Sequence, residues 1–142
     1  MLLRSMMAVS MFAAATAALA QSDPIAARKA LMKAQNDQAR IAVRMVRGED
    51  PFDAAKADAA FKAFLDTTEK FGTLFPDNSK TGDTKAAPAI WTDRAGFNAA
   101  LAKFTKDVSD NRAKTKTLDE FKVAINAVGS NCGSCHDKYR VK

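Results

Sequence analysis

Histidine, cysteine and long apolar segments are scarce in this chain, and each shortage excludes a class of protein. Its 142 residues include one histidine and two cysteines. A structural zinc site takes four ligands, mostly cysteine and histidine, and three such side chains cannot complete one. After the first twenty residues no apolar run is long enough to span a bilayer. The net charge is +6, but the lysines are spread over every segment. Because no basic stripe forms, we expect solvated helix faces and no nucleic-acid partner, while an acidic protein partner stays compatible.

The first twenty residues have the pattern of a secretory signal peptide. Arg4 supplies the positive start, residues 6–18 are apolar, and Ala18-Leu19-Ala20 fits a cleavage site before Gln21. The apolar run is too short to favour a retained membrane anchor. We therefore expect residues 1–20 to be removed and residues 21–142 to form one exported domain with no membrane span.

Helix signals fill the rest of the chain, and strand signals are absent. Asp23-Pro24 is an N-cap followed by proline at the first helical position, and Gly48 ends the apolar pattern that follows. Asp50-Pro51 repeats the start signal, which predicts a second helix as far as Gly72.

Two more helices are expected after a long polar connection over residues 73–87. Thr92 is the predicted N-cap of the third helix, whose apolar pattern ends near residues 111–114. Thr117 begins the fourth, and Glu120 three residues later completes a capping box. Four amphipathic helices with short connections predict an all-α protein, an antiparallel four-helix bundle.

The scarce cysteines and histidine occur together, in Cys132-Gly133-Ser134-Cys135-His136. This C-x-x-C-H run is the attachment signature of c-type haem. On a helix the two thiols and the imidazole project to one side, so that thioether bonds hold the porphyrin while the imidazole binds iron. A redox-active thiol pair or another metal are the weaker alternatives, because a thiol–disulfide pair normally begins a helix after a strand.

The second axial position of the iron decides the function, and no second histidine exists to fill it. After signal removal only Met32 and Met45 offer a thioether. They lie about 20 Å and roughly 140° apart on one helix, so both cannot reach one iron. In an antiparallel bundle Met32 lies level with His136, whereas Met45 lies at the far end. Met32 is therefore the candidate ligand, and an ordinary core methionine is the alternative.

Two arginines are candidates for pairing with the haem propionates. Arg28 is one turn before Met32, and Arg140 is one turn after His136. A solvated surface arginine is the alternative at position 28, and a place over the proximal side of the haem is the alternative at position 140. Aromatic residues that could border the porphyrin are weak candidates, since a small core contains such residues anyway: Trp91, Phe97 and Tyr139.

The chain resembles the class II c-type cytochromes, cytochrome c′ and its low-spin c-556 relatives, over nearly all of residues 21–142. The resemblance implies a four-helix bundle, a periplasmic location and His136 as proximal ligand. It also implies that the residue at position 32 either blocks the sixth site or, as in the c-556 type, ligates iron. The motifs that carry it are Arg28-Lys29-Ala30-Leu31-Met32-Lys33, residues 48–55, Leu74-Phe75-Pro76, Pro88-Ala89-Ile90-Trp91 and residues 132–140.

The leading functional hypothesis is a periplasmic one-electron carrier, not an enzyme, with one covalent haem c ligated by His136 and Met32. The alternative is a five-coordinate cytochrome c′ that binds nitric oxide or carbon monoxide below Met32. A haem-free thiol–disulfide protein is the third. Redox partner proteins of unknown identity are expected, and a homodimer through the first two helices is compatible with the sequence.

Overall fold

The computed structural model describes residues 23–142, so the predicted signal peptide lies outside the described residues. Within this part of the chain no helix is long and apolar enough to cross a membrane. The elements are α1 (Pro24–Val46), α2 (Ala54–Phe71), a 3₁₀ turn η1 (Asp77–Ser79), α3 (Ala89–Thr92), α4 (Arg94–Asn111) and α5 (Leu118–Tyr139).

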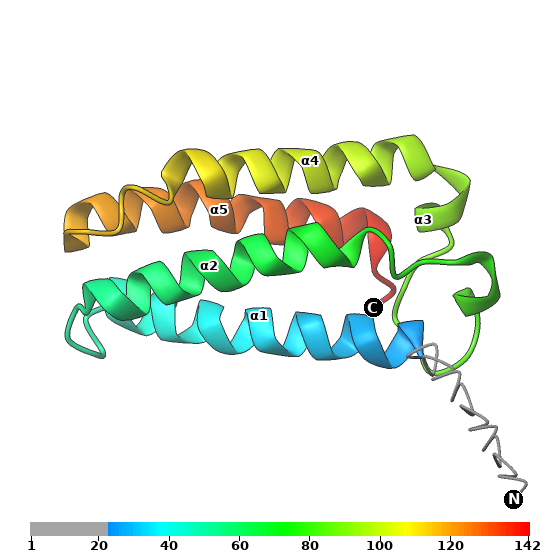
Figure 1. Cartoon of the computed structure of the whole chain (residues 1–142), viewed down its shortest axis with the longest axis horizontal. Helices are drawn as coiled ribbons and strands as arrows, with labels where there is room; N and C mark the ends of the chain where they lie inside the picture. The colour runs from blue at the N-terminus through cyan, green and yellow to red at the C-terminus, as the bar shows by residue number, and fades with distance from the viewer. Residues whose placement is uncertain (1–22) are drawn as a thin grey trace, which may run out of the picture.

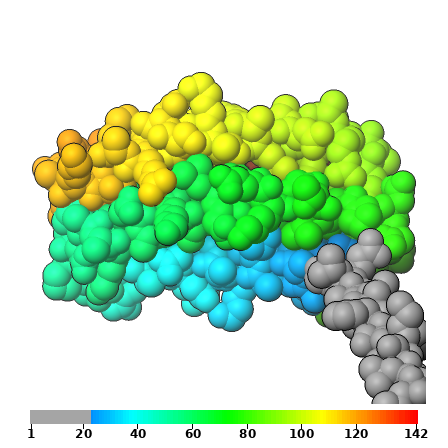
Figure 2. All heavy atoms as spheres, viewed as in Figure 1, coloured from blue at the N-terminus to red at the C-terminus, as the bar shows by residue number. Residues whose placement is uncertain are grey.

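The four long helices form an antiparallel bundle, as predicted (Figure 1). Around the bundle α1 packs on α2, α2 on α4, α4 on α5, and α5 on α1. The space-filling view shows α2 crossing the middle of one face, between α4 and α1 (Figure 2). Because α1 and α5 are antiparallel neighbours, the start of α1 and the end of α5 lie at the same end of the molecule.

Two of the four predicted helix starts are confirmed. Asp23 caps α1, with its carboxylate accepting from the Ile25 amide at 2.9 Å. Thr117 caps α5, with its hydroxyl accepting from the Glu120 amide at 3.3 Å. Both side chains satisfy backbone N–H groups that the first helical turn leaves without partners.

The other two predicted caps are wrong by one and three residues. The Asp50 carboxylate accepts a hydrogen bond from Arg44 at 2.7 Å and caps no helix. Asp53 is the N-cap of α2, which therefore begins three residues later than predicted. Thr92 belongs to the short α3, and Asp93 caps α4 by accepting from the Gly96 amide at 3.1 Å. In both cases an aspartate just downstream takes the cap, as its short carboxylate favours this position.

The buried apolar residues form two separate clusters. The first fills the end of the bundle where α1 finishes and α5 begins; its fully buried members are Ala42, Met45, Ala57, Ala60, Phe61, Phe64, Val108, Phe121, Ala124 and Val128. The second lies at the opposite end, where Phe75, Ile90, Phe97 and Tyr139 are buried together. Rings of the second cluster meet edge to face, with Phe97 centred 5.0 Å from Phe75 and 5.3 Å from Tyr139.

The end of α5 is joined to α4 at one crowded point. The Asp93 carboxylate accepts hydrogen bonds from the Tyr139 hydroxyl at 3.1 Å and from Lys138. These donors and the Gly96 amide hold the pKa of Asp93 below its usual value, with Lys138 the largest cause. Gly96 itself touches this group, since a Cβ there would overlap the Asp93 carboxylate and lie 2.7 Å from the Tyr139 hydroxyl.

We expect Gly96→Ala to destabilise the protein by about 1–3 kcal/mol, because the added methyl group must displace the Asp93–Tyr139 contact. Chemical denaturation of the haem-loaded protein measures the change. Gly129→Ala is the matched control, a helical glycine with open space around its Cβ. There the same substitution should be neutral or stabilise by up to about 1 kcal/mol. Equal effects at the two positions would contradict the packing described.

Candidate haem-binding site

The attachment motif lies in the last two turns of α5. Cys132 and Cys135 are half-buried free thiols, and His136 is exposed. Burial raises the pKa of both thiols, so they are protonated at neutral pH and lie in largely apolar surroundings. Although His136 is exposed overall, partial desolvation of its ring and then the Arg140 charge lower its pKa, against a smaller opposing effect of Asp137. A neutral imidazole is the form that binds iron.

The two methionines of α1 lie in very different surroundings. Met32 is half-buried, two turns into α1, at the end of the bundle that holds His136. Met45 is 1% exposed and packs inside the first apolar cluster, near the other end of α1. The fold therefore brings Met32, and not Met45, to the end of the bundle where the C-x-x-C-H motif lies.

The parts of α1 and α5 at the end that holds the attachment motif bury fewer residues than the two apolar clusters do. Between Arg28 and Ala42 no residue of α1 is fully buried, and between Asn131 and Tyr139 none of α5 is. These are the helix segments that carry Met32 and the attachment motif. A flat apolar group held between them would cover side chains that are now only half-buried.

A buried polar atom in the same region was missed by the sequence analysis. The Gln35 carbonyl oxygen Oε1 is buried and has no hydrogen-bond partner among the described residues. A buried acceptor that the protein leaves unpaired normally accepts from water or from a bound group, so its surroundings are relevant to the site. Gln35 is three residues after Met32, hence on the same side of α1. The sequence feature that could have revealed it is the spacing of Gln35, three residues after Met32 and four before Ala39, which places all three on one side of α1.

Arg28 holds the long connection between α2 and α3. It is 4% exposed, and its two terminal nitrogens donate to the Leu74 carbonyl, to the Ser79 hydroxyl and carbonyl, and to the Thr84 hydroxyl, at 2.7–3.1 Å. The guanidinium also stacks 4.9 Å from the Phe75 ring centre. The alternative of a solvated arginine is therefore wrong. With four bonds made by the terminal nitrogens, only Nε–H remains for a propionate, and that pairing stays a prediction.

Arg140 is exposed and directly follows α5. Its backbone forms an isolated antiparallel bridge with Ala86, and the Val141 amide donates to the Lys85 carbonyl at 2.9 Å. This pairing ties the end of the chain to the long connection. The guanidinium has no carboxylate within ion-pair distance in the described part of the chain, so its contact with a propionate or the proximal side also stays a prediction.

The three weak aromatic candidates all serve the second apolar cluster. Phe97 and Tyr139 are buried there. Trp91 packs against the cluster, and its indole N–H donates to the Phe75 carbonyl at 3.1 Å. Cys135 packs against the same cluster, so the cluster borders the attachment motif.

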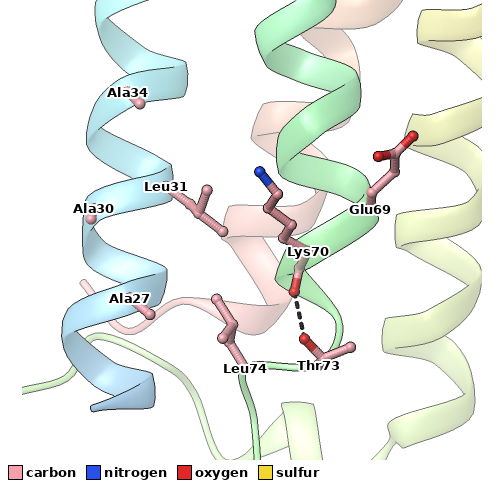
Figure 3. A pocket seen from close by; sticks show the side chains of 8 residues that line it. All are labelled: Ala27, Ala30, Leu31, Ala34, Glu69, Lys70, Thr73 and Leu74. Atoms are coloured by element: carbon pink, nitrogen blue, oxygen red, sulfur yellow. Dashed lines mark hydrogen bonds between the residues drawn. The ribbon is translucent and has the colours of Figure 1, made fainter. Parts of the chain in front are cut away.

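A groove of about 680 Å³ lies on the outer side of the bundle, between α1 and α2 (Figure 3). Its walls are Ala27, Ala30, Leu31, Ala34, Glu69, Lys70, Thr73 and Leu74. None of the predicted haem-binding residues lines it, although Leu31 adjoins Met32 in sequence. This groove is therefore not the predicted haem site, which lies between α1 and α5.

Comparison with known proteins bears directly on this arrangement. A family model described as cytochrome c′ matches residues 23–140, almost the whole described chain. The chain belongs to the cytochrome c′ family. Cytochrome c-556 of Rhodopseudomonas palustris is 36% identical over 133 residues, covering 90% of this chain and 89% of its own length. Cytochrome c′ of the same organism is 39% identical over 126 residues, covering 88% and 86%.

The solved structures agree with the sequence comparison. Cytochrome c′ from Rhodopseudomonas palustris superposes with a TM-score of 0.82 at 38% identity, covering 86% of this chain and 98% of that one. Members of the cytochrome c′ family are periplasmic haem proteins that carry electrons or bind gases. The cofactor of this chain is accordingly one covalently bound c-type haem. The half-buried thiols, the neutral imidazole and the half-buried side chains of α1 and α5 at this end of the bundle fit that group.

Proposed function

We propose that this protein is a periplasmic one-electron carrier whose haem is six-coordinate, with His136 and Met32 as axial ligands. The observation that carries the proposal is the position of Met32, half-buried on α1 at the end of the bundle where α5 presents His136. Cys132 and Cys135 are the attachment residues in this proposal. The predicted removal of residues 1–20 accounts for the location.

Each residue has a separate task in this arrangement. The two thiols fix the haem edge on α5, and the rigid helix holds the His136 imidazole at a constant orientation. The Met32 thioether would bind the iron from α1. When bound, the haem supplies the reversible ferric–ferrous couple, and a soft thioether ligand favours the ferrous state relative to a second imidazole.

A filled sixth position also explains why we expect no enzymatic activity. Both axial sites are then occupied by the chain, so neither a substrate nor a small gas can reach the iron without displacing Met32. Electron transfer would need no such displacement. The redox partner is a protein whose identity the chain does not specify, and the exported chain's positive charge suits an acidic partner.

A gas-binding protein is the second candidate, favoured by the similarity to cytochrome c′ as well as to cytochrome c-556. In that case Met32 covers the iron without bonding to it. Carbon monoxide distinguishes the two. We expect the ferrous wild-type protein to bind carbon monoxide slowly, at a rate independent of gas concentration once Met32 dissociation limits the reaction. Fast binding that rises linearly with concentration would establish the open site instead.

A haem-free thiol–disulfide protein is tested by a haem stain after denaturing electrophoresis. Covalent attachment through Cys132 and Cys135 predicts a stained band, and Cys132→Ser with Cys135→Ser should abolish it.

A homodimer also belongs to this proposal: the groove between α1 and α2, lined largely by alanine and leucine, offers a second copy close helix contact. Analytical ultracentrifugation of the haem-loaded protein measures the assembly state.

A further inference from the structure

One polar side chain lies on the side of α1 that faces the predicted haem, and its role is not explained by the bundle itself. Gln35 follows Met32 by three residues, and its Oε1 is buried without a donor. Buried side-chain acceptors are normally paired, so this oxygen calls for a partner that the described residues do not supply, such as water or a bound group. On α1, Met32 and Ala39 lie three and four residues from Gln35 and cannot donate a hydrogen bond, while Gln38 can donate but makes no hydrogen bond to Gln35.

The height of Gln35 along the bundle can be compared with that of the attachment motif. Gln35 lies ~4.5 Å beyond Met32 in the direction of α1, and Cys132 lies ~6 Å before His136 on α5. Because the two helices run antiparallel, both displacements point the same way, from the axial ligands toward the centre of the bundle. Gln35 is thus level with the thioether edge of a haem held between His136 and Met32.

We propose that the Gln35 carbonyl sets the reduction potential of the haem by placing the negative end of its amide dipole against the porphyrin edge. This inference rests on the proposed function in one respect, that the haem lies between α1 and α5; it holds whether or not Met32 bonds to iron. The ferric haem carries one more positive charge than the ferrous haem. A buried carbonyl oxygen beside it therefore stabilises the ferric state and lowers the potential, and the effect is strong because no solvent screens it.

The test is the midpoint potential of the haem-loaded protein, measured by spectroelectrochemistry. Gln35→Leu replaces the amide with an apolar side chain of similar bulk. The dipole is lost, so the reduction potential should rise. Asn36→Leu is the matched control, since it removes an amide from the next residue of α1, which is exposed, and should leave the potential unchanged. A potential unchanged in Gln35→Leu, or a shift equal to that of the control, would overturn the inference.

A second variant keeps the test decisive if Gln35→Leu fails to fold. Gln35→Glu retains the shape of the side chain and replaces the dipole with a titratable group. The potential should then fall below that of the wild type and become dependent on pH, since ionising the carboxyl favours the ferric state. A rise in potential, or none of this pH dependence, would show that the carbonyl end does not face the haem.

The experiments distinguish a wrong role for Gln35 from a wrong proposed function. A wild-type protein with high-spin haem removes the electron-carrier account but leaves the predicted shift in Gln35→Leu unchanged. A low-spin wild type with no shift removes only the role of Gln35. A wild type without covalent haem, revealed by the stain, overturns both.

Discussion

Met32→Ala should turn the low-spin haem of the wild type into a high-spin haem. Alanine has no donor atom to replace the proposed Met32 ligand, and the two free thiols of the described chain are committed to the porphyrin in the proposed site. The iron then loses its sixth ligand or takes a water molecule, which is a weak ligand. The visible spectrum and electron paramagnetic resonance of the ferric protein report the change. The same variant should bind carbon monoxide rapidly in the ferrous state.

Met45→Ala is the control for this result. Met45 is 1% exposed inside the first apolar cluster, so its loss leaves a cavity and should cost about 2–5 kcal/mol in unfolding free energy. Its spectrum should nevertheless remain that of the wild type, because the residue lies at the other end of α1. A Met32→Ala protein that stays low-spin would show that another side chain supplies the sixth ligand, and the electron-carrier account would lose its main support.

Arg28→Lys should destabilise the haem-loaded protein by about 2–4 kcal/mol. Lysine keeps the charge, but its single ammonium group cannot reach the four oxygens that the planar guanidinium contacts on the long connection. Buried acceptors are then left without donors, and the stacking on Phe75 is lost. Urea denaturation followed by absorbance of the haem and by circular dichroism measures the change.

Arg40→Lys provides the comparison on the same helix. Arg40 is exposed and forms no ion pair among residues 23–142, so the same substitution should change stability by no more than about 0.5 kcal/mol. If Arg28→Lys is equally mild, then the hydrogen bonds between Arg28 and the connection contribute little. Redox titration of both variants would in addition show whether Arg28 interacts with a propionate.

Local signals predicted the helices well, but they could not rank competing caps. The predictions of Asp23 and Thr117 as the caps of their helices are confirmed. Asp50 and Thr92 were plausible by the same rule, yet Asp53 and Asp93 are the caps. The choice depends on tertiary contacts, such as the ion pair of Asp50 with Arg44 and the contact of Asp93 with Tyr139.

Some residues of the haem site are likewise predictable from local spacing, whereas others depend on contacts between distant parts of the chain. The spacing of Cys132, Cys135 and His136 is local, so the sequence alone predicts it. The placement of Met32 at the same end of the bundle as His136 follows from the antiparallel order of the helices and needs only the topology. The bonds of Arg28 join residues 46–56 positions apart, and no periodicity reveals them. Gln35 is visible only as a buried oxygen without a partner.

In the proposed site a thioether from α1 bonds to iron held by an imidazole from α5. The absorption spectrum of the purified ferric wild-type protein tests it in one measurement. We predict low-spin bands together with the weak far-red band that arises from sulfur-to-iron charge transfer, and this band should vanish in Met32→Ala. A high-spin spectrum in the wild type at neutral pH would contradict ligation by Met32. Gas binding at an open iron site would then be the better-supported function.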